Sequence, residues 1–277
     1  MVIRTYFWHA RRMGLLKPLA GIVGLKKDLY FRHGNAGDTF NRDLLGRTYG
    51  CRVKNTSDAP RLLCTGSIAH QAKAGDVLCG VGVKALDHLP RVSPPGSIFL
   101  RGLRGPKTLE AFRDAGHDVS GVRFLMDPGI LISSFLGPEA LRTVGREIVF
   151  IPHYRERDHY AKNPPNGIRV LDIDNPPIRI AREILKAKIV ASSSLHGIVF
   201  AHSLGRPAVP VKPRTEEPLF KYEDYYAALH VRMPAWLDEP TLDGLAAYSD
   251  TPLDIGDAKA RISFPPEEEL RFLGVIR

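Results

Sequence analysis

Residues 189–197 read Ile189-Val190-Ala191-Ser192-Ser193-Ser194-Leu195-His196-Gly197, and the chain then continues to Leu204-Gly205-Arg206-Pro207. An apolar, β-branched run that ends in three hydroxyl residues predicts a strand followed by a turn. The following residues have helical periodicity and end at a glycine and a proline, which are typical of a helix C-terminus. The stretch therefore predicts a strand–turn–helix unit, the building block of α/β folds.

The predicted turn places a histidine at the start of a helix. The free amides of a first helical turn and the positive end of the helix dipole favour a phosphate or carboxylate. The dipole lowers the proton affinity of His196 and a bound anion raises it, so we expect His196 to titrate near neutrality and to move protons. The alternative is a histidine packed in an ordinary αβ unit, because such turns are common.

The composition limits the class of protein. With 277 residues, 44% of them hydrophobic, and no long apolar run, the chain suits one or two soluble domains rather than a membrane-spanning protein. Cys51, Cys64 and Cys79 are widely spaced, which favours reduced thiols in a cytoplasm. A formal net charge of +9 favours nucleic acid, phosphorylated small molecules or an anionic membrane as partner. The basic residues are dispersed and form no recognition motif, so we expect no nucleic-acid partner.

Residues 1–24 form a basic, amphipathic segment. Large apolar residues alternate there with basic ones: Tyr6, Phe7, Trp8, Leu15, Leu16 and Leu19 with Arg4, Arg11, Arg12 and Lys17. The pattern predicts a short helix, with residues 1–20 either on an anionic membrane surface or packed on the body of the protein. It lacks the apolar core and cleavage site of a signal peptide.

Strand-like and helical runs alternate through the rest of the chain, which predicts parallel sheets covered by helices. A turn-rich stretch over residues 133–146 separates two such series. We therefore expect two Rossmann-like αβα lobes, at residues 25–140 and 146–235. Ligands of open parallel sheets bind beyond the carboxyl ends of the strands, so the predicted site is the cleft between the lobes.

Several short motifs follow one another in this chain in a recognisable order. They are Gly34-Asn35-Ala36-Gly37-Asp38, Thr65-Gly66-Ser67, Arg101-Gly102-Leu103-Arg104-Gly105-Pro106-Lys107-Thr108, Asp127-Pro128-Gly129, Ile151-Pro152-His153, Ser192-Ser193-Ser194-Leu195-His196-Gly197 and Phe220-Lys221-Tyr222-Glu223-Asp224-Tyr225-Tyr226. Together they resemble the polysaccharide pyruvyl transferases, most of all the xanthan-type ketal pyruvate transferases, over roughly Tyr30 to Tyr226.

The resemblance implies a reaction and an architecture. A pyruvyl group would pass from phosphoenolpyruvate to two hydroxyls of a sugar, which forms a cyclic ketal and releases phosphate. The implied fold is glycosyltransferase-B-like, with the acceptor in the first lobe, the donor in the second, and residues 236–277 crossing back to the first lobe. Acceptors of the family are typically lipid-linked glycans, which implies a cytoplasmic protein at the inner face of the membrane.

The donor of that reaction needs positive groups and proton transfer. We expect His196 to act as acid/base, Arg104 and Lys221 to stabilise the leaving phosphate, and His153 to be a second acid/base or donor contact. Ser193, Ser194, Arg101 and Lys107 complete the predicted donor site. Alternatives remain open: Arg101 and Arg104 pair with Asp127 or cap a strand, and Lys107 is merely solvated. Many members of the family that it resembles carry arginine where this chain has Ser194, and Lys221 or Arg104 could compensate for that charge.

Asn35, Asp38, Gly66 and Ser67 are the predicted acceptor contacts. Asp38 is either a base or the N-cap of the following helix, and residues 65–67 are either a contact or a tight turn. A separate acidic motif, Asp172-Ile173-Asp174, imitates the metal-binding pair of nucleotide-sugar glycosyltransferases.

We predict no metal and no cofactor, because acidic pairs of this spacing are usually solvated. Two alternative functions stay open: a nucleotide-sugar-dependent glycosyltransferase of the same fold, and a non-catalytic anion- or lipid-binding protein.

Overall fold

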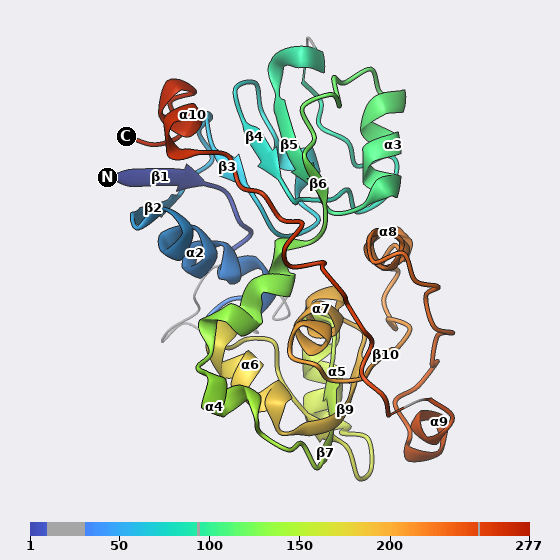
Figure 1. The fold of residues 1–277 in the computed structure, drawn as a ribbon. Helices are drawn as coiled ribbons and strands as arrows, with labels where there is room; N and C mark the ends of the chain where they lie inside the picture. Colours follow the sequence, from blue (N-terminus) through green and yellow to red (C-terminus); the bar gives the residue numbers. More distant parts are fainter. Residues whose placement is uncertain (10–30, 93–94, 249) are drawn as a thin grey trace, which may run out of the picture.

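The computed structural model describes residues 1–9, 31–92, 95–248 and 250–277. It is a mixed α/β structure with two lobes, each built on a parallel sheet (Figure 1). The first lobe contains β1 (Val2–Thr5), α2 (Ala36–Tyr49), β2 (Arg52–Asn55), β3 (Leu62–Leu63), η2 (Ala69–Gln71), β4 (Val77–Cys79), η3 (Pro95–Ser97), β5 (Phe99–Leu103), α3 (Pro106–Asp114) and β6 (Phe124–Leu125). The 3-10 helix η4 (Pro128–Phe135) and α4 (Pro138–Leu141) connect it to the second.

The second lobe begins with β7 (Glu147–Ile151). It continues with η5 (Tyr154–Glu156), α5 (Arg157–Lys162), β8 (Arg169–Val170), α6 (Pro177–Leu185), β9 (Ala187–Ser192), α7 (Leu195–Ser203), β10 (Ala208–Pro210), α8 (Phe220–Ala228) and α9 (Leu242–Ala246). The expected two-lobe arrangement of parallel sheets is therefore confirmed, as is the strand–turn–helix unit of β9 and α7.

The N-terminus differs from its prediction. Val2 to Thr5 form a strand inside the first sheet, paired in parallel with β2 on one side and β3 on the other. Ile3, Thr5 and Phe7 are buried in alternation with more open neighbours, which is the two-residue period of a strand. The prediction of an amphipathic helix is thus wrong for these residues, and residues 10–24 lie outside the described part of the chain. Short alternating runs of aromatic and basic residues suit either element, and pairing with β3 decides for the strand.

The order of the strands creates two topological switch points. In the first sheet, β2-β1-β3-β4-β5-β6, the chain leaves β1 toward β2 and later returns to its other side with β3. In the second, β10-β9-β7-β8, it leaves β7 toward β8 and returns with β9. The loops after β1 and β3 and those after β7 and β9 border the crevices where open α/β sheets bind ligands.

The lobes share one apolar core. Phe40 of α2 packs edge-on against Phe200 of α7, with ring centroids 5.7 Å apart, and against Phe135 of η4, at 5.1 Å. Asp174, which follows β8, accepts hydrogen bonds from the amides of Arg32, His33 and Gly34 just before α2. These contacts keep the two switch points facing each other.

The C-terminal segment returns to the first lobe. After α9 the chain runs back to α10 (Glu267–Phe272), which lies beside β1 in Figure 1. The amide of Val2 donates to the carbonyl of Arg277, and that of Arg4 donates to the carbonyl of Val275. The chain therefore runs from α9 in the second lobe to an end that pairs with β1 of the first lobe. Within the described residues, no helix is long and apolar enough to span a membrane.

Candidate active site

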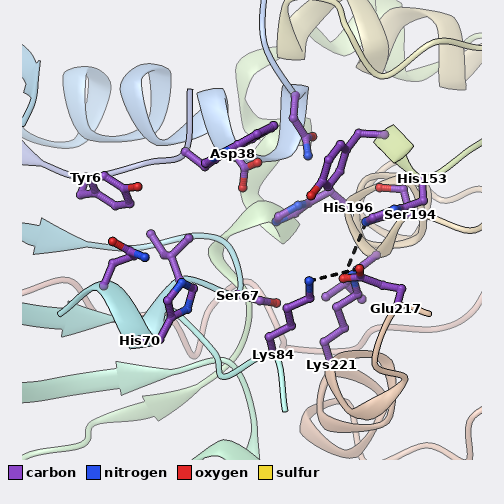
Figure 2. Close-up of a pocket in the computed structure, with 16 residues that line it drawn as sticks. Tyr6, Asp38, Ser67, His70, Lys84, His153, Ser194, His196, Glu217 and Lys221 are labelled. Carbon is purple, nitrogen blue, oxygen red and sulfur yellow. Dashed lines mark hydrogen bonds and ion pairs between the residues drawn. The ribbon is translucent and has the colours of Figure 1, made fainter. Parts of the chain in front are cut away.

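A pocket lies between the lobes at the two switch points. Its lining includes seven of the predicted residues: Asn35, Asp38, Ser67, His153, Ser194, His196 and Lys221. Figure 2 shows Tyr6 and His70 at one end of this pocket and Lys84, Glu217 and Lys221 at the other. Asp38, Ser67 and His196 lie between the two ends. We call the end with Tyr6 and His70 the aromatic end, and the end with Lys84, Glu217 and Lys221 the cationic end.

The serine turn brings α7 to the pocket. The Ser192 hydroxyl accepts from the amide of Ser194 (3.0 Å) and lies 2.8 Å from the carbonyl oxygen of Ile151, which ties the turn to β7. Ser194 is the N-cap residue of α7, and its side chain makes no capping bond and lines the pocket. Ser193 turns away, because its hydroxyl donates to Glu156 and accepts from the amide of His153 (2.8 Å). Ser193 thus supports the loop instead of contacting a ligand.

His196 is held between two elements. Its Nε2 lies 3.7 Å from Oδ2 of Asp127, and both atoms are buried without a hydrogen-bond partner. The other edge of the ring lies against Gly37 of α2, where an added Cβ would be 2.0 Å from Nδ1. Only glycine therefore fits at position 37. Burial lowers the pKa of His196, against an opposing effect of Asp127, so the imidazole is neutral at neutral pH.

Asp38 is an acid with an unusual environment. The N-cap of α2 is Asn35, whose side chain accepts from the amide of Gly37 (3.1 Å), so the alternative that Asp38 caps this helix is wrong. Asp38 instead points into the pocket, near Gly66. Burial raises its pKa to about 7; nearby Lys221 acts against this rise and Asp127 adds to it. A carboxyl group with this pKa can give and take protons at neutral pH.

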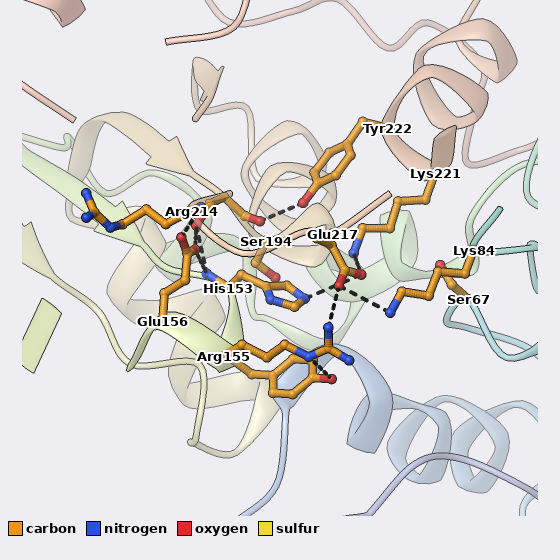
Figure 3. Close-up of polar contacts among 12 residues, drawn as sticks. Ser67, Lys84, His153, Arg155, Glu156, Ser194, Arg214, Glu217, Lys221 and Tyr222 are labelled. Carbon is orange, nitrogen blue, oxygen red and sulfur yellow. Dashed lines mark hydrogen bonds and ion pairs between the residues drawn. The ribbon is translucent and has the colours of Figure 1, made fainter. Parts of the chain in front are cut away.

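Glu217 organises the cationic end (Figure 3). One of its carboxylate oxygens accepts from Lys221 Nζ (2.7 Å), and the other lies 3.2 Å from Lys84 Nζ and 3.3 Å from Arg155 Nη1. His153 Nε2 is 3.7 Å from the same carboxylate. Lys84 comes from the first lobe and Glu217 from the second, so this ion pair crosses the cleft. Three cations surround one anion, which leaves an excess of two positive charges.

Burial and charge shift the pKa values of this cluster. Burial lowers the pKa of Lys221 to about 8, opposed by Glu217. Burial acts to raise the pKa of Glu217, but Lys221, His153 and Lys84 outweigh it and bring the pKa to about 2. Burial also lowers the pKa of His153 well below its usual value, with Lys221 acting in the same direction. At pH 7, Lys221 is therefore mostly charged, Glu217 is a carboxylate and His153 is neutral.

Arg104 is a positioning residue rather than a free cation. It is fully buried, and its guanidinium donates to Asp224 (3.0 Å), Ser67 (2.7 Å) and the carbonyl of Val83 (2.6 Å). Asp224 of α8 also accepts from the amide and hydroxyl of Thr108. The predicted contact of Arg104 with the donor is therefore replaced by a buried ion pair that joins the turn before α3 to α8. Neither arginine of this motif pairs with Asp127.

Two other predicted donor residues lie elsewhere. Arg101 points from β5 toward α10, where it pairs with Glu269. Lys107 forms an exposed ion pair with Glu223. Neither side chain lines the pocket, so the structure does not bring them to the candidate site. Lys107 does lie in the first turn of α3, as expected, but its side chain leaves on another face. Arg101 lies in the middle of β5 instead of in the turn after the strand, and its side chain points away from the pocket.

The acidic motif has a structural role. Asp172 and Asp174 both pair with Arg157, at 2.5 Å and 3.0 Å, and Asp174 also holds the amides before α2. Within the described residues, no group of three or more His, Cys, Asp or Glu side chains is placed to hold a metal ion. The pair that favoured a nucleotide-sugar transferase is thus occupied by arginine.

Sequence reasoning missed Lys84, Glu217 and the aromatic residues Tyr6 and Trp8. Lys84 follows a buried strand and a glycine-containing turn, which was a usable signal for a residue at a sheet edge. Glu217 lies four residues before Lys221, the spacing of a helical ion pair. Trp8 belonged to the segment assigned to a membrane surface.

The comparisons with known proteins agree with this arrangement. A family model described as polysaccharide pyruvyl transferase matches residues 54–214, more than half of the chain. An "Uncharacterized protein L143" from Acanthamoeba polyphaga mimivirus is 29% identical over 201 residues, which cover 68% of each chain. No solved structure matches the chain significantly. The chain belongs to the polysaccharide pyruvyl transferase family.

Proposed function

We propose that this protein transfers a pyruvyl group from phosphoenolpyruvate to two hydroxyls of one sugar, with release of phosphate. The acceptor proposed is a sugar of an exopolysaccharide repeat unit carried on a lipid at the inner face of the cytoplasmic membrane. The family match supports a glycan acceptor. The assignment of phosphoenolpyruvate as the donor rests on the cationic end, where two lysines lie at the start of α7 beside His196 and Asp38.

The cationic end suits a small molecule with two anionic groups. Lys84 and Lys221 exceed Glu217 by one positive charge in the lining of this end, and Arg155, which pairs with Glu217 from outside the lining, adds a second. The first-turn amides of α7 add to that attraction. The N-cap position of α7 holds Ser194, which is uncharged, so in this proposal the two lysines supply the positive charge. A bound anion would also keep Lys221 protonated, because it raises a pKa that burial has lowered.

The reaction requires a balanced set of proton transfers. One sugar oxygen bonds to C2 of the donor while the methylene carbon gains a proton and becomes a methyl group. The bond from C2 to the phosphate oxygen then breaks, and the second sugar oxygen bonds to C2 to close the ketal. One hydroxyl proton ends on the methyl group, and the other leaves with phosphate.

Two groups between the ends of the pocket are suited to these steps. We assign His196 Nδ1 as the base for the first hydroxyl, since Asp127 beside Nε2 favours the tautomer with its proton there. Protonated Asp38 supplies the proton for the methylene carbon and recovers one from the second hydroxyl. The proton held by His196 passes to the departing phosphate. Both groups return to their starting states, and no metal or cofactor takes part in this proposal.

Calorimetric titration of the protein with phosphoenolpyruvate tests the donor assignment without an acceptor. We expect phosphoenolpyruvate to bind and UDP-glucose not to bind. Lys84→Ala should weaken binding about tenfold or more, and Lys107→Ala, a matched control at an exposed ion pair, should leave it unchanged. Binding of UDP-glucose alone, or equal effects of the two substitutions, would overturn the proposal.

A further inference from the structure

The aromatic end of the pocket has no assigned role. Tyr6 and Trp8 follow β1, and the alternation of the strand continues through them. Because Phe7 is buried, its two neighbours point to the opposite side, and both line the pocket. Both residues precede the region matched by the family model, which starts at residue 54.

The position of Trp8 is fixed from several sides. Asn55, the last residue of β2, accepts from the amide of Phe7 (3.2 Å) and donates to its carbonyl (3.0 Å). The Trp8 ring packs edge-on against Phe31, at 5.4 Å between centroids, and lies 5.1 Å from Tyr154 of η5. The indole is therefore half-buried and packed between aromatic residues of both lobes.

Polar groups surround this aromatic surface. His70 and Gln71 of η2 line the pocket with Tyr6 and Trp8, and Asn35 and Ser67 add further polar groups to the same lining. A pyranose ring has the matching chemistry, because its axial C–H bonds suit the electron-rich face of an aromatic ring and its hydroxyls need hydrogen-bond partners at the edge. A purely apolar ligand would offer no hydrogen-bond partner to the side chains of His70 and Gln71.

We propose that Tyr6 and Trp8, together with Tyr154, form the platform on which the acceptor hexopyranose stacks, with its hydroxyls directed at Asp38 and His196. The platform orients the acceptor toward the cationic end, since Figure 2 places Asp38 and His196 between Tyr6 and the lysines. This inference rests on the proposed function for its second substrate, and names Trp8 as a specificity-determining residue.

Fluorescence of Trp8 tests the platform directly. The chain has two tryptophans, and Trp236 packs on Tyr222 and does not line the pocket, so Trp236→Phe leaves Trp8 as the reporter. The probes are methyl β-D-galactopyranoside and methyl β-D-glucopyranoside, each with and without phosphoenolpyruvate. Galactitol, which has no ring, and hexanol, which has no hydroxyl array, are the controls. We expect a saturable change with at least one glycoside and none with either control.

A second measurement uses substitutions and saturation-transfer NMR of the same glycosides. Trp8→Leu should weaken glycoside binding about tenfold or more, while Trp8→Phe retains most of it. Phe272→Leu removes a fully exposed aromatic ring on α10 and is the matched control, with no expected effect.

The outcomes separate the two proposals. No glycoside response with or without phosphoenolpyruvate, a response to hexanol alone, or unchanged binding by Trp8→Leu overturns the platform. If phosphoenolpyruvate binds at the lysines in those cases, the donor assignment still stands. A glycoside response in a protein that does not bind phosphoenolpyruvate supports the platform and removes the proposed reaction.

Discussion

The two ends of the pocket are built on different physical principles. At the cationic end, Lys84 and Lys221 are held by one internal carboxylate, Glu217, so the attraction for a ligand depends on charge and pairing. At the aromatic end, Tyr6 and Trp8 present ring surfaces fixed by backbone clamping and packing. One end thus selects for charge and the other for shape. In the proposed reaction, this difference would order the two substrates along one axis, with Asp38 and His196 between them.

The substitution with the largest expected effect should reduce turnover while leaving ligand binding at both ends of the pocket almost unchanged. His196→Asn should reduce turnover about a thousandfold or more, because it removes the proposed base while retaining a side chain of similar size. Phosphoenolpyruvate affinity and the Trp8 fluorescence response should change by less than about threefold. Turnover is measured as phosphate release with an accepting glycoside. Calorimetry measures phosphoenolpyruvate affinity, and fluorescence measures the response of Trp8.

His202→Gln supplies the control for that experiment. His202 lies on the same helix, is buried, and bonds to Tyr225 away from the pocket. Turnover per folded molecule should be retained in this variant. A His196 variant within tenfold of the wild-type rate would remove His196 from the mechanism.

A second substitution should loosen both ends together. Arg104→Met leaves Asp224 buried without its cation, and we expect a loss of about 3–5 kcal/mol in the free energy of unfolding, measured by urea denaturation. Arg101→Met breaks a pair that is partly open to solvent, and should cost about 1 kcal/mol or less. Equal losses for the two arginines would contradict the role given to the buried pair.

A third pair of substitutions should act on the cationic end alone, in opposite directions. Lys221→Met should weaken phosphoenolpyruvate binding about tenfold to a hundredfold, since a hydrogen bond to a charged group contributes roughly 1.5–3 kcal/mol. Glu217→Gln should strengthen it, because the carboxylate that competes for both lysines is neutralised. Neither should alter glycoside binding at Trp8. Weaker donor binding in the glutamine variant would show that Glu217 helps to build the site instead.

The smallest expected effect is a pH dependence. Asp38 must begin protonated in the proposed mechanism, so kcat/KM should fall about tenfold per pH unit above about 7, the pKa of Asp38. Because burial raises this pKa above its unfolded value, the folded state binds more protons between pH 4 and 7, and stability contributed by Asp38 is lost as pH rises through that window.

The substitution Asp38→Asn should remove the contribution of Asp38 to the pH dependence of kcat/KM and to the pH dependence of stability. The decline in kcat/KM near pH 7 should disappear, and unfolding measured at pH 4 and pH 8 should show a smaller loss of stability than in the wild type. A wild-type rate that rises between pH 7 and 8 would reverse the proton assignment of Asp38.

Local patterns predicted the elements that carry their own signals. Pro106 does begin α3, and the β9–α7 unit has the expected strand, turn and helix. The strand β1 was missed because it is only four residues long, and because the neighbouring aromatic and basic residues also suit an interfacial helix. Its identity depends on pairing with β3, some sixty residues further along the chain.

The sequence by itself determined the local unit that carries the candidate site: a histidine at a helix start after a buried strand, because turns and helix starts are set by neighbouring residues. Only the tertiary structure decided which charges serve a ligand. Lys84 and Lys107 are the same residue type, yet one reaches the pocket and the other pairs at the surface. Arg104 pairs with Asp224, 120 residues away, and is thereby withdrawn from the ligand. Burial and pairing depend on distant residues, and together they set the charge that a site can offer.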